Sequence, residues 1–325
     1  MKGIPTTSLQ ASDNNPWVLV VVGPTCSGKS AVGLELARRL QGEIVSADSR
    51  QVFKYLDIGT AKPTEAQRRK VKHYFVDEML PDEDFNAGNF GDLGREVIAR
   101  ILSEGRVPIV VGGSGLYVQS LIDGFFDGPG ADEEVRKELE RRLRAEGLLS
   151  LMEELRRVDP ETAARIDPTK PRRVIRALEV YHVSGMPLST LHREKKVRVG
   201  FVPLLFGLRW KRGDLYRRIE SRCDEMIAAG LLDEVERLEA MGYTDSLNAL
   251  NSVGYAEAFA YRRGETSYEE FVRLFKQNTR RYAKRQVTWF RRDERIRWIE
   301  MVEGREVSDV ADDICRGGGI LPNES

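Results

Sequence analysis

Eight consecutive residues near the start of the chain, Gly23-Pro24-Thr25-Cys26-Ser27-Gly28-Lys29-Ser30, have the types and spacing of a phosphate-binding loop. The pattern is two glycines with four residues between them, followed by Lys-Ser. The glycines let backbone N–H groups converge on a phosphate, and the helix that follows adds the partial positive charge of its N-terminus. Lys29 can reach the outermost phosphate, and the hydroxyl of Ser30 can bind Mg²⁺. The segment predicts a polyphosphate site.

The sequence does not identify that polyphosphate as ATP. In phosphate-loop NTPases an apolar strand ends in an acidic residue that helps to hold Mg²⁺. Here the apolar run at residues 107–111 ends in Gly112-Gly113-Ser114 instead. The glycines leave room for a ligand, and Ser114 can donate a hydrogen bond to it. A plain tight turn is the alternative interpretation.

A second polar group, Asp48-Ser49, follows the short apolar run at residues 43–47. A carboxylate there could hold Mg²⁺ through water or act as a general base, although an aspartate after a strand is more often a helix cap. The run Asp57-Ile58-Gly59-Thr60-Ala61-Lys62-Pro63 comes next. Its glycine and proline indicate a shaped loop, and a simple connection between elements is the alternative.

The basic residues concentrate between Phe271 and Arg297, where ten cations face two acids and the net charge is +8 over 27 residues. The aromatic residues interleaved with them are Tyr282, Trp289 and Phe290. Cations for phosphates and rings for stacking are typical of a nucleic-acid surface. A solvated helix whose aromatic residues face the core is the alternative.

Arginines one helical turn apart occur twice elsewhere. Arg172 and Arg176 lie in the basic patch Lys170-Pro171-Arg172-Arg173-Val174-Ile175-Arg176 and share a helix face. Arg218 and Arg222 repeat that spacing, which suits either phosphate contacts or ion pairs with Glu220 and Asp224.

Composition alone leaves the partner open. The 325 residues carry 51 basic and 51 acidic side chains, and the zero net charge argues against nucleic acid only if the placement of the charges is ignored. Three scattered cysteines lack metal-ligand spacing and favour a reducing, cytoplasmic compartment. No apolar run is long enough to span a membrane. The three histidines, His73, His182 and His192, form no metal-ligand pattern.

Strand-like and helical segments alternate around these motifs. Strands are expected at residues 17–22, 43–47, 106–111 and 201–207, with helices after the first and the third. This alternation predicts an α/β fold: a phosphate-loop core with a parallel sheet flanked by helices, and its functional residues at the carboxyl ends of the strands. Residues 131–198 read as helical, so a helical insertion domain is expected. The expected divisions are a tail at 1–15, the first part of the core at 16–128, the insertion at 129–199, the rest of the core at 200–315 and a tail at 316–325.

Seven motifs occur in an order that resembles one family. They are Gly23 to Ser30, Asp48-Ser49, Asp57 to Pro63, Gly112-Gly113-Ser114 with Leu116-Tyr117, Arg176-Ala177-Leu178-Glu179-Val180, Val253-Gly254-Tyr255, and Ala283-Lys284-Arg285-Gln286 with Thr288-Trp289. Together they resemble the bacterial tRNA dimethylallyltransferases, also called tRNA isopentenyltransferases, over about residues 17–300.

The resemblance implies an activity and a set of roles. The family transfers a dimethylallyl group from dimethylallyl diphosphate to the exocyclic amine of the adenosine 3′-adjacent to the anticodon, so the loop would hold the diphosphate rather than ATP. Asp48 would be the general base, and Thr25, Lys29, Ser114 and Arg218 would stabilise the departing diphosphate, with Mg²⁺ held by Ser30. The implied enzyme is a monomer that binds the tRNA anticodon stem-loop. The implied tRNA contacts are Asp48, Ser49, Arg50, Gln51, Ser114, Arg136, Arg172, Arg173, Val174, Ile175, Arg176, Asn251, Ser252, Val253, Gly254, Tyr255, Ala256, Lys284 and Arg285.

The chain departs from the family pattern in two places. Ser114 stands where threonine is usual, and Asn251-Ser252 replaces Arg-Cys. The zinc-finger extension of eukaryotic relatives is not present in the sequence, which favours the bacterial type. Two other classes compete with this reading: a small-metabolite phosphate-loop kinase that uses ATP, and a non-catalytic RNA-binding protein.

Overall fold

The computed structural model describes residues 15–124, 132–194 and 199–320. Most of the predicted tail at 1–15, the predicted boundary at 128–129 and residues 321–325 of the second predicted tail lie outside the described residues. The chain divides into two compact units, one formed by Met1–Ile122 and Gly200–Ser325 and the other by Asp123–Val199.

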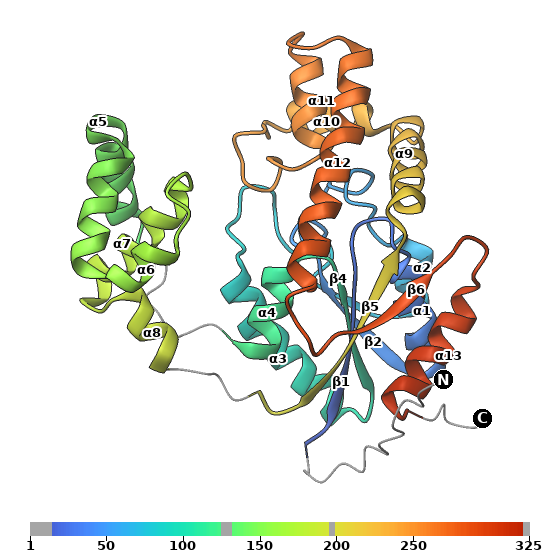
Figure 1. Cartoon of the computed structure of the whole chain (residues 1–325). Helices are drawn as coiled ribbons and strands as arrows, with labels where there is room; N and C mark the ends of the chain where they lie inside the picture. Colours follow the sequence, from blue (N-terminus) through green and yellow to red (C-terminus); the bar gives the residue numbers. More distant parts are fainter. Residues whose placement is uncertain (1–14, 125–131, 195–198, 321–325) are drawn as a thin grey trace. The chain divides into compact units, whose positions relative to one another are not determined.

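A six-stranded sheet forms the centre of the first unit (Figure 1). Its order is β3-β2-β4-β1-β5-β6, and every neighbouring pair is parallel. The five residues Val18–Val22 of β1 are fully buried, as an apolar run without polar alternation predicts for a central strand. The predicted parallel α/β fold is therefore confirmed. The strands are β1 (Trp17–Val22), β2 (Gly42–Ala47), β3 (His73–Tyr74), β4 (Val107–Gly112), β5 (Val202–Trp210) and β6 (Arg297–Met301).

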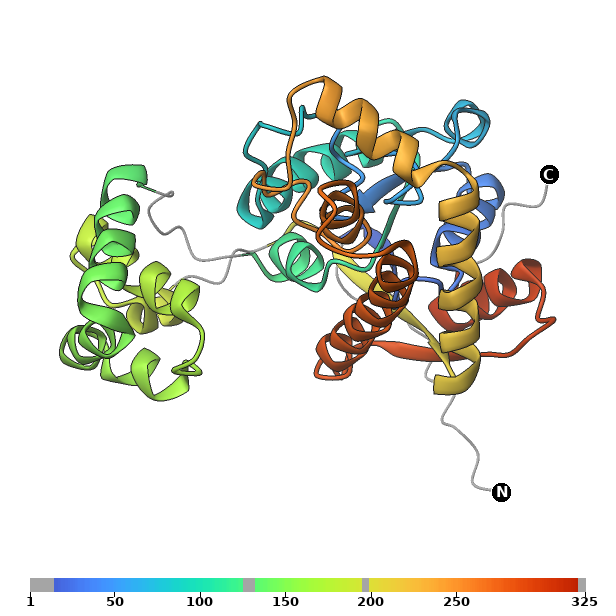
Figure 2. The same cartoon turned by 90° about the horizontal axis from the view of Figure 1, so that it is seen from above.

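Helices cover both faces of the sheet (Figure 2). On one face α1 (Lys29–Arg39) and α13 (Val307–Gly318) pack against Leu19 and Val21 through residues such as Leu36 and Ile314. The other face is covered by α3 (Ala87–Ser103) and α4 (Gly115–Asp123), while the short helix α2 (Glu65–Lys70) precedes β3. Because α13 runs to Gly318 and Ile320 is buried in the same cluster, residues 316–320 belong to the folded core and not to a tail.

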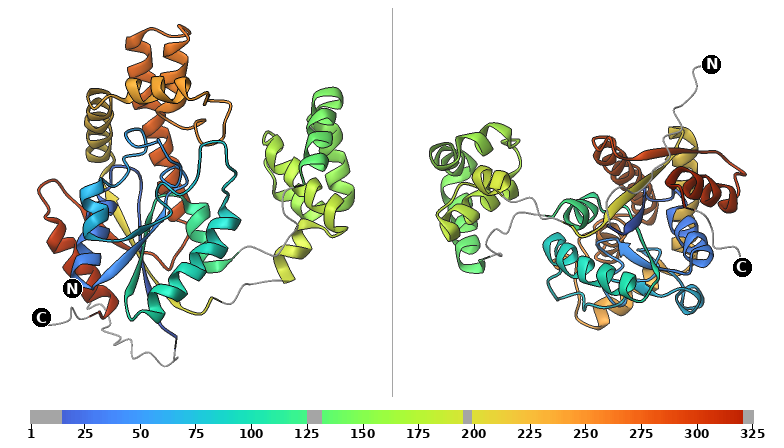
Figure 3. Two further views of the ribbon diagram at one scale, coloured as in Figure 1. Left: turned by 180° about the vertical axis from the view of Figure 1, so that it is seen from behind. Right: turned by 90° about the horizontal axis from the view of Figure 1, so that it is seen from below.

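Four further helices gather at the carboxyl ends of the strands, as the views from behind and below in Figure 3 also show. They are α9 (Arg212–Ala228), α10 (Leu231–Ala240), α11 (Tyr255–Arg262) and α12 (Tyr268–Phe290). The basic segment at 271–297 is thus not one continuous helix, since α12 ends at Phe290 and β6 begins at Arg297.

The second unit is helical and has a core of its own. It contains α5 (Glu133–Val158), α6 (Pro160–Arg165), α7 (Pro171–Ser184) and α8 (Leu188–Glu194). Leu139, Leu151 and Leu155 of α5 pack against Val174 and Leu178 of α7. Gly147, with φ at 80°, interrupts α5 with a kink, because glycine adopts that conformation without a Cβ clash.

Candidate active site

The phosphate-loop motif joins β1 to α1 and has the backbone of an anion-binding turn. Cys26 and Gly28 have φ values of 63° and 92°, and the N–H of Ser27 donates to the carbonyl of Pro24 at 3.2 Å. No side chain caps α1, whose N-cap residue is Gly28. The first N–H groups of this helix are therefore free of a side-chain acceptor and suit a phosphate.

Lys29 opens α1, and its Nζ donates to the carbonyl of Pro24 at 3.3 Å. Burial lowers the pKa of this ammonium, whereas the nearby carboxylate of Asp48 raises it. A desolvated ammonium with little compensation gains stability when an anion enters its surroundings. A polyphosphate bound at this loop would therefore stabilise the charged form of Lys29.

Arg218 of α9 contacts the backbone of the phosphate loop. Its Nε donates to the carbonyl of Cys26 at 2.9 Å, and its guanidinium lies over the ring of Trp210, 4.4 Å from the centroid. Trp210 in turn donates from Nε1 to the carbonyl of Ser27 at 3.0 Å. Arg218 therefore approaches the loop as the family resemblance implies, while its contact with a diphosphate stays a prediction.

Arg222, one turn further along α9, forms an ion pair with a different acid from those expected. Arg222 pairs with Glu225 at 3.3 Å, whereas Glu220 and Asp224 pair with Arg280 and Lys276 of α12. The alternative that Arg218 and Arg222 are the partners of Glu220 and Asp224 is therefore wrong.

Asp48 follows β2 and is separated from the phosphate loop by the end of β4, which lies between β2 and β1 in the sheet. Its Oδ1 accepts the N–H of Arg50 at 2.9 Å, and a turn follows, so the helix-cap alternative does not hold. Its Oδ2 makes no hydrogen bond with any other described residue. The hydroxyl of Ser114, after β4, accepts the N–H of Ser49 at 3.0 Å and ties the two strand ends together.

The glycines after β4 make room for α12 rather than for a ligand. A Cβ on Gly112 would overlap the backbone of Ala47, and one on Gly113 would overlap the amide nitrogen of Gln286. Gly115, one residue after Ser114, is restricted in the same way by the indole of Trp289. Tyr282 of the same helix is also packed near the site, and burial together with the charge of Asp48 raises its pKa to about 12. The expectation that Gly112 and Gly113 leave space for a ligand is wrong, since the space beside them is filled by Ala47 and Gln286.

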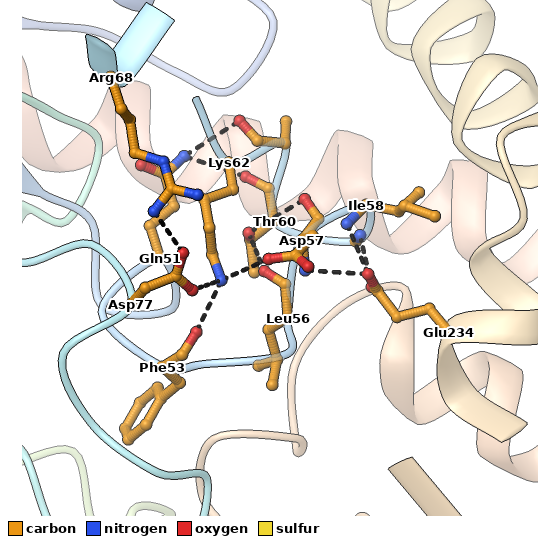
Figure 4. Close-up of polar contacts among 12 residues, drawn as sticks. Gln51, Phe53, Leu56, Asp57, Ile58, Thr60, Lys62, Arg68, Asp77 and Glu234 are labelled. Carbon is orange, nitrogen blue, oxygen red and sulfur yellow. Dashed lines mark hydrogen bonds and ion pairs between the residues drawn. The ribbon is translucent and has the colours of Figure 1, made fainter. Parts of the chain in front are cut away.

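The loop Asp57 to Pro63 is held by a buried carboxylate (Figure 4). Glu234 of α10 accepts three consecutive N–H groups, those of Asp57, Ile58 and Gly59, at 2.9, 2.8 and 3.1 Å. It also accepts the hydroxyl of Tyr255 at 2.6 Å. Three successive backbone donors around one anion form a nest. The loop is therefore held in a fixed conformation, as its glycine and proline predict, while its part in the site stays a prediction.

Two further side chains fix the same loop, as Figure 4 shows. Nζ of Lys62 donates to the carbonyl of Phe53 at 2.9 Å, and it pairs with Asp57 at 2.7 Å and with Asp77. Gln51 accepts the hydroxyl of Ser46 at 3.1 Å and donates to the carbonyls of Thr60 and Ala61 at 3.1 and 3.3 Å. The amide of Gln51 is thus engaged internally, and its contact with tRNA stays a prediction.

The expected tRNA contacts in the first unit differ in exposure. Asn251, Lys284 and Arg285 are exposed, and Arg285 lies over the ring of Tyr282. Tyr255 is fully buried and bonded to Glu234, so its side chain cannot contact a macromolecule on the surface. Its role is to support the loop at 57–63.

The expected contacts in the second unit divide in the same way. Arg172 and Arg173 are exposed, but Val174 and Ile175 are buried in the helical core, so a side-chain contact between these two and tRNA is ruled out. Arg136 and Arg176 both pair with the fully buried carboxylate of Glu179, at 3.2 and 2.8 Å. This shared partner orients two of the predicted tRNA-binding arginines.

The charge of +8 counted along the sequence overstates the free charge of the basic segment. Arg273, Lys276 and Arg280 pair with Glu270, Asp224 and Glu220, all of which lie outside the counted window. Phe290 is buried, as the core-facing alternative predicts, and Trp289 is 37% exposed. Within the described parts of the chain, the cations of the segment that form no ion pair are Arg281, Lys284, Arg285, Arg291, Arg292 and Arg297.

The described residues contain no group of three or more histidine, cysteine or acidic side chains that could hold a metal ion. The exposed hydroxyl of Ser30 makes no hydrogen bond with the rest of the described chain, so it is free to bind a hydrated cation. Among the helices that the structure describes, none combines the length and the hydropathy needed to cross a bilayer.

Comparison with known proteins decides the family. The model of the family described as IPP transferase matches residues 51–293. The tRNA dimethylallyltransferase of Pelotomaculum thermopropionicum is 45% identical over 300 residues, which cover 92% of this chain and 95% of that protein. The chain belongs to the IPP transferase family. A second relative, the tRNA dimethylallyltransferase of Geobacter metallireducens, is 47% identical over 87% of this chain and 92% of its own length.

Solved structures of IPP transferase relatives have the same fold. The tRNA isopentenylpyrophosphate transferase of Bacillus halodurans superposes with a TM-score of 0.67 at 37% identity, covering 93% of this chain and 96% of that one. A eukaryotic dimethylallyltransferase solved while acting on tRNA reaches a TM-score of 0.82 at 25% identity over 95% of this chain and 81% of its own. The resemblance inferred from the motifs is confirmed.

Two residues that fix the site were not singled out as site residues from the sequence. Glu234 lies in an ordinary amphipathic helix, and only its full burial marks it. Gln286 belongs to the last family motif, but its partners lie 261 and 173 residues away. Neither contact leaves a local signal in the sequence.

Proposed function

We propose that this chain is a tRNA dimethylallyltransferase, which transfers a dimethylallyl group from dimethylallyl diphosphate to the exocyclic amine of the adenosine 3′-adjacent to the anticodon. One observation carries the proposal: in a chain of the IPP transferase family, a phosphate loop and a carboxylate with an unbonded oxygen lie on either side of the end of β4. The reaction needs an anion site and a base that are separate but adjacent.

In the proposed step, the amine nitrogen attacks the allylic carbon while the bond from that carbon to the diphosphate oxygen breaks. Oδ2 of Asp48 accepts the proton that the amine loses, and the electron pair of the broken bond leaves with the diphosphate. An exocyclic adenine amine is a weak nucleophile, so orientation and removal of the proton both contribute to the rate. The oxygen of Asp48 that bonds Arg50 holds the carboxylate in place.

The diphosphate would be bound by the phosphate loop. The N–H groups at the start of α1, the ammonium of Lys29 and the guanidinium of Arg218 supply positive charge where negative charge develops on the leaving group. The hydroxyls of Thr25 and Ser114 lie at the ends of the neighbouring strands. Mg²⁺, held by Ser30, would neutralise part of the diphosphate charge when bound.

The other substrate would lie against exposed basic residues of both units, chiefly Lys284, Arg285, Arg172 and Arg173. The target base would leave its stack to reach Asp48. We also infer a cytoplasmic location, since all three cysteines of the chain are free thiols. A monomer is inferred from the family resemblance.

A labelled-transfer assay tests the proposal. Wild-type protein is incubated with unmodified tRNA, Mg²⁺ and labelled dimethylallyl diphosphate, and the label in tRNA is counted. Asp48→Asn is expected to lose turnover by roughly 100-fold or more while tRNA binding is kept, because the base is removed without a change of shape. The matched control is Asp84→Asn, since Asp84 is exposed and makes no hydrogen bond within the described chain.

The rival functions give different results in the same assay. A kinase would leave tRNA unlabelled and would hydrolyse or transfer the γ-phosphate of ATP. A non-catalytic RNA-binding protein would bind tRNA without either reaction. Full turnover in Asp48→Asn would exclude Asp48 as the base.

A further inference from the structure

Helix α12 reaches the phosphate loop through one buried side chain. Gln286 is 6% exposed, and its Oε1 accepts the backbone N–H of Thr25 at 2.8 Å. Its Nε2 donates to the carbonyl of Gly113 at 2.9 Å. Thr25 follows β1 and Gly113 follows β4, and these two strands are neighbours in the sheet. One amide therefore spans the turns at the ends of both strands.

The surrounding contacts show that this approach is built into the fold. The overlap of a Cβ on Gly113 with the amide of Gln286, and of one on Gly115 with Trp289, means that glycine is needed for α12 to come so close. One turn earlier on α12, Tyr282 lies near Ser114, whose hydroxyl slightly lowers the pKa of the tyrosine against the larger effect of burial. Ser114 in turn accepts the N–H of Ser49 after β2. Through Gln286, α12 thus holds the ends of β1 and β4, and Ser114 extends the connection to the end of β2.

We propose that Gln286 is a positioning residue for the leaving group, an inference that rests on the proposed function. By holding the N–H of Thr25, it fixes the peptide plane from which the threonine hydroxyl and the following N–H groups face the diphosphate. By donating to the carbonyl oxygen of Gly113, it pairs the partial negative charge of that oxygen, which would otherwise repel the diphosphate.

A glutamine is suited to this place because it offers one acceptor and one donor without a net charge. A carboxylate would place a negative charge beside the diphosphate, and an apolar side chain would leave a buried donor and a buried acceptor unpaired. Gln286 touches no substrate in this arrangement, and it acts through Thr25 and Gly113.

The first test uses Gln286→Met, which keeps the length of the side chain and removes both hydrogen bonds. The Kd of inorganic diphosphate, measured by calorimetry, is expected to rise roughly 10-fold, and kcat to fall roughly 10- to 100-fold, because the loop loses its set geometry. KM for tRNA is expected to change less than about twofold, since the exposed cations of α12 are untouched. Gln277→Met is the matched control, because the amide of Gln277 on the same helix forms no hydrogen bond within the described residues.

The second test uses Gln286→Glu, which keeps an acceptor for the N–H of Thr25 but turns a negative oxygen toward Gly113. Diphosphate affinity is expected to fall further than in Gln286→Met, again with tRNA binding kept. Wild-type diphosphate affinity in either folded variant would overturn the proposal. An equal loss of tRNA and diphosphate affinity in both would also overturn it, because that result describes a general packing role.

Different experiments decide the proposed function and the proposed role of Gln286. If wild-type protein transfers no label to tRNA, the proposed function fails. The calorimetric comparison of diphosphate binding still decides the role of Gln286, since it requires no turnover.

Discussion

The nest around Glu234 allows one substitution to be worked through in detail. Glu234→Gln keeps the shape of the side chain but replaces two acceptor oxygens by one oxygen and one NH₂ group. In the wild type, Oε2 accepts the N–H groups of Asp57 and Ile58, while Oε1 accepts the N–H of Gly59 and the hydroxyl of Tyr255. Whichever way the new amide turns, its NH₂ group faces two donors.

The magnitude follows from that count. A buried donor left without an acceptor costs about 1–3 kcal/mol, so two of them cost about 2–6 kcal/mol. If the NH₂ group faces the side of Tyr255, the rotating hydroxyl of Tyr255 can accept from it, which lowers the loss toward the smaller figure. Tyr255→Phe removes one donor and leaves the three N–H groups bonded, so about 1 kcal/mol is expected for it.

Two measurements check this prediction. The free energy of unfolding in urea is followed by circular dichroism, and hydrogen exchange reports on the amides of Asp57, Ile58 and Gly59. Glu236→Gln is the control, because its carboxylate is 63% exposed and its ion pair with Arg262 spans 3.5 Å. That control is expected to change stability by less than about 0.5 kcal/mol. A loss below about 1 kcal/mol in Glu234→Gln, with the three amides still protected, would refute the reasoning.

Three more predictions follow from the site. Burial lowers the pKa of Lys29 in the free protein. A bound diphosphate would raise it again, so binding at a pH between the lowered pKa and the ordinary lysine value of 10.5 takes up more protons in wild type than in Lys29→Met. Calorimetry in buffers of different ionisation enthalpy measures the difference, and equal proton uptake would contradict it. Glu179→Gln removes the charge that orients Arg136 and Arg176 and should weaken tRNA binding about 3- to 10-fold without changing diphosphate affinity, as measured by filter binding and calorimetry. Replacing Lys284 and Arg285 together by serine should reduce the slope of log K for tRNA against log salt by about 1–2, whereas Arg273→Ser, an already paired arginine, should leave it unchanged.

The sheet could be predicted wherever a strand is apolar on both faces. β1, β2, β4 and β5 carry such runs, and the structure places each within a few residues of its expected bounds. β3 has only two residues, and β6, at the edge of the sheet, is exposed at Arg297 and Glu300 and buried only at Met301, so neither has a run to recognise. Edge strands of this kind depend on their neighbour for pairing more than on their own composition.

The residues of the candidate site also differ in how far they could be predicted from the sequence. The phosphate loop could be predicted because its chemistry is contained in eight consecutive residues. The support from Glu234 and Gln286 could not, because both side chains bond atoms that are distant in the sequence. Glu179 bonds Arg176 within the same helix and Arg136 in another helix, and only the second contact lacks a local signal. The net charge of a segment likewise does not predict its unpaired charge in the folded protein. The acids that pair with Arg273, Lys276 and Arg280 lie outside residues 271–297.

The place of the helical unit in the chain has a consequence for synthesis. β1 pairs on one side with β4 and on the other with β5, and the whole helical unit is translated between those two partners. The ~100 residues from the end of β4 to the end of β5 take roughly 5–20 s at about 5–20 residues per second. During that interval the four strands already made leave an apolar edge open, which is a template for pairing with another chain. A chain released early, within the helical unit, would therefore carry an aggregation-prone sheet of four strands, and this chain should depend on chaperones most strongly at that stage of its synthesis.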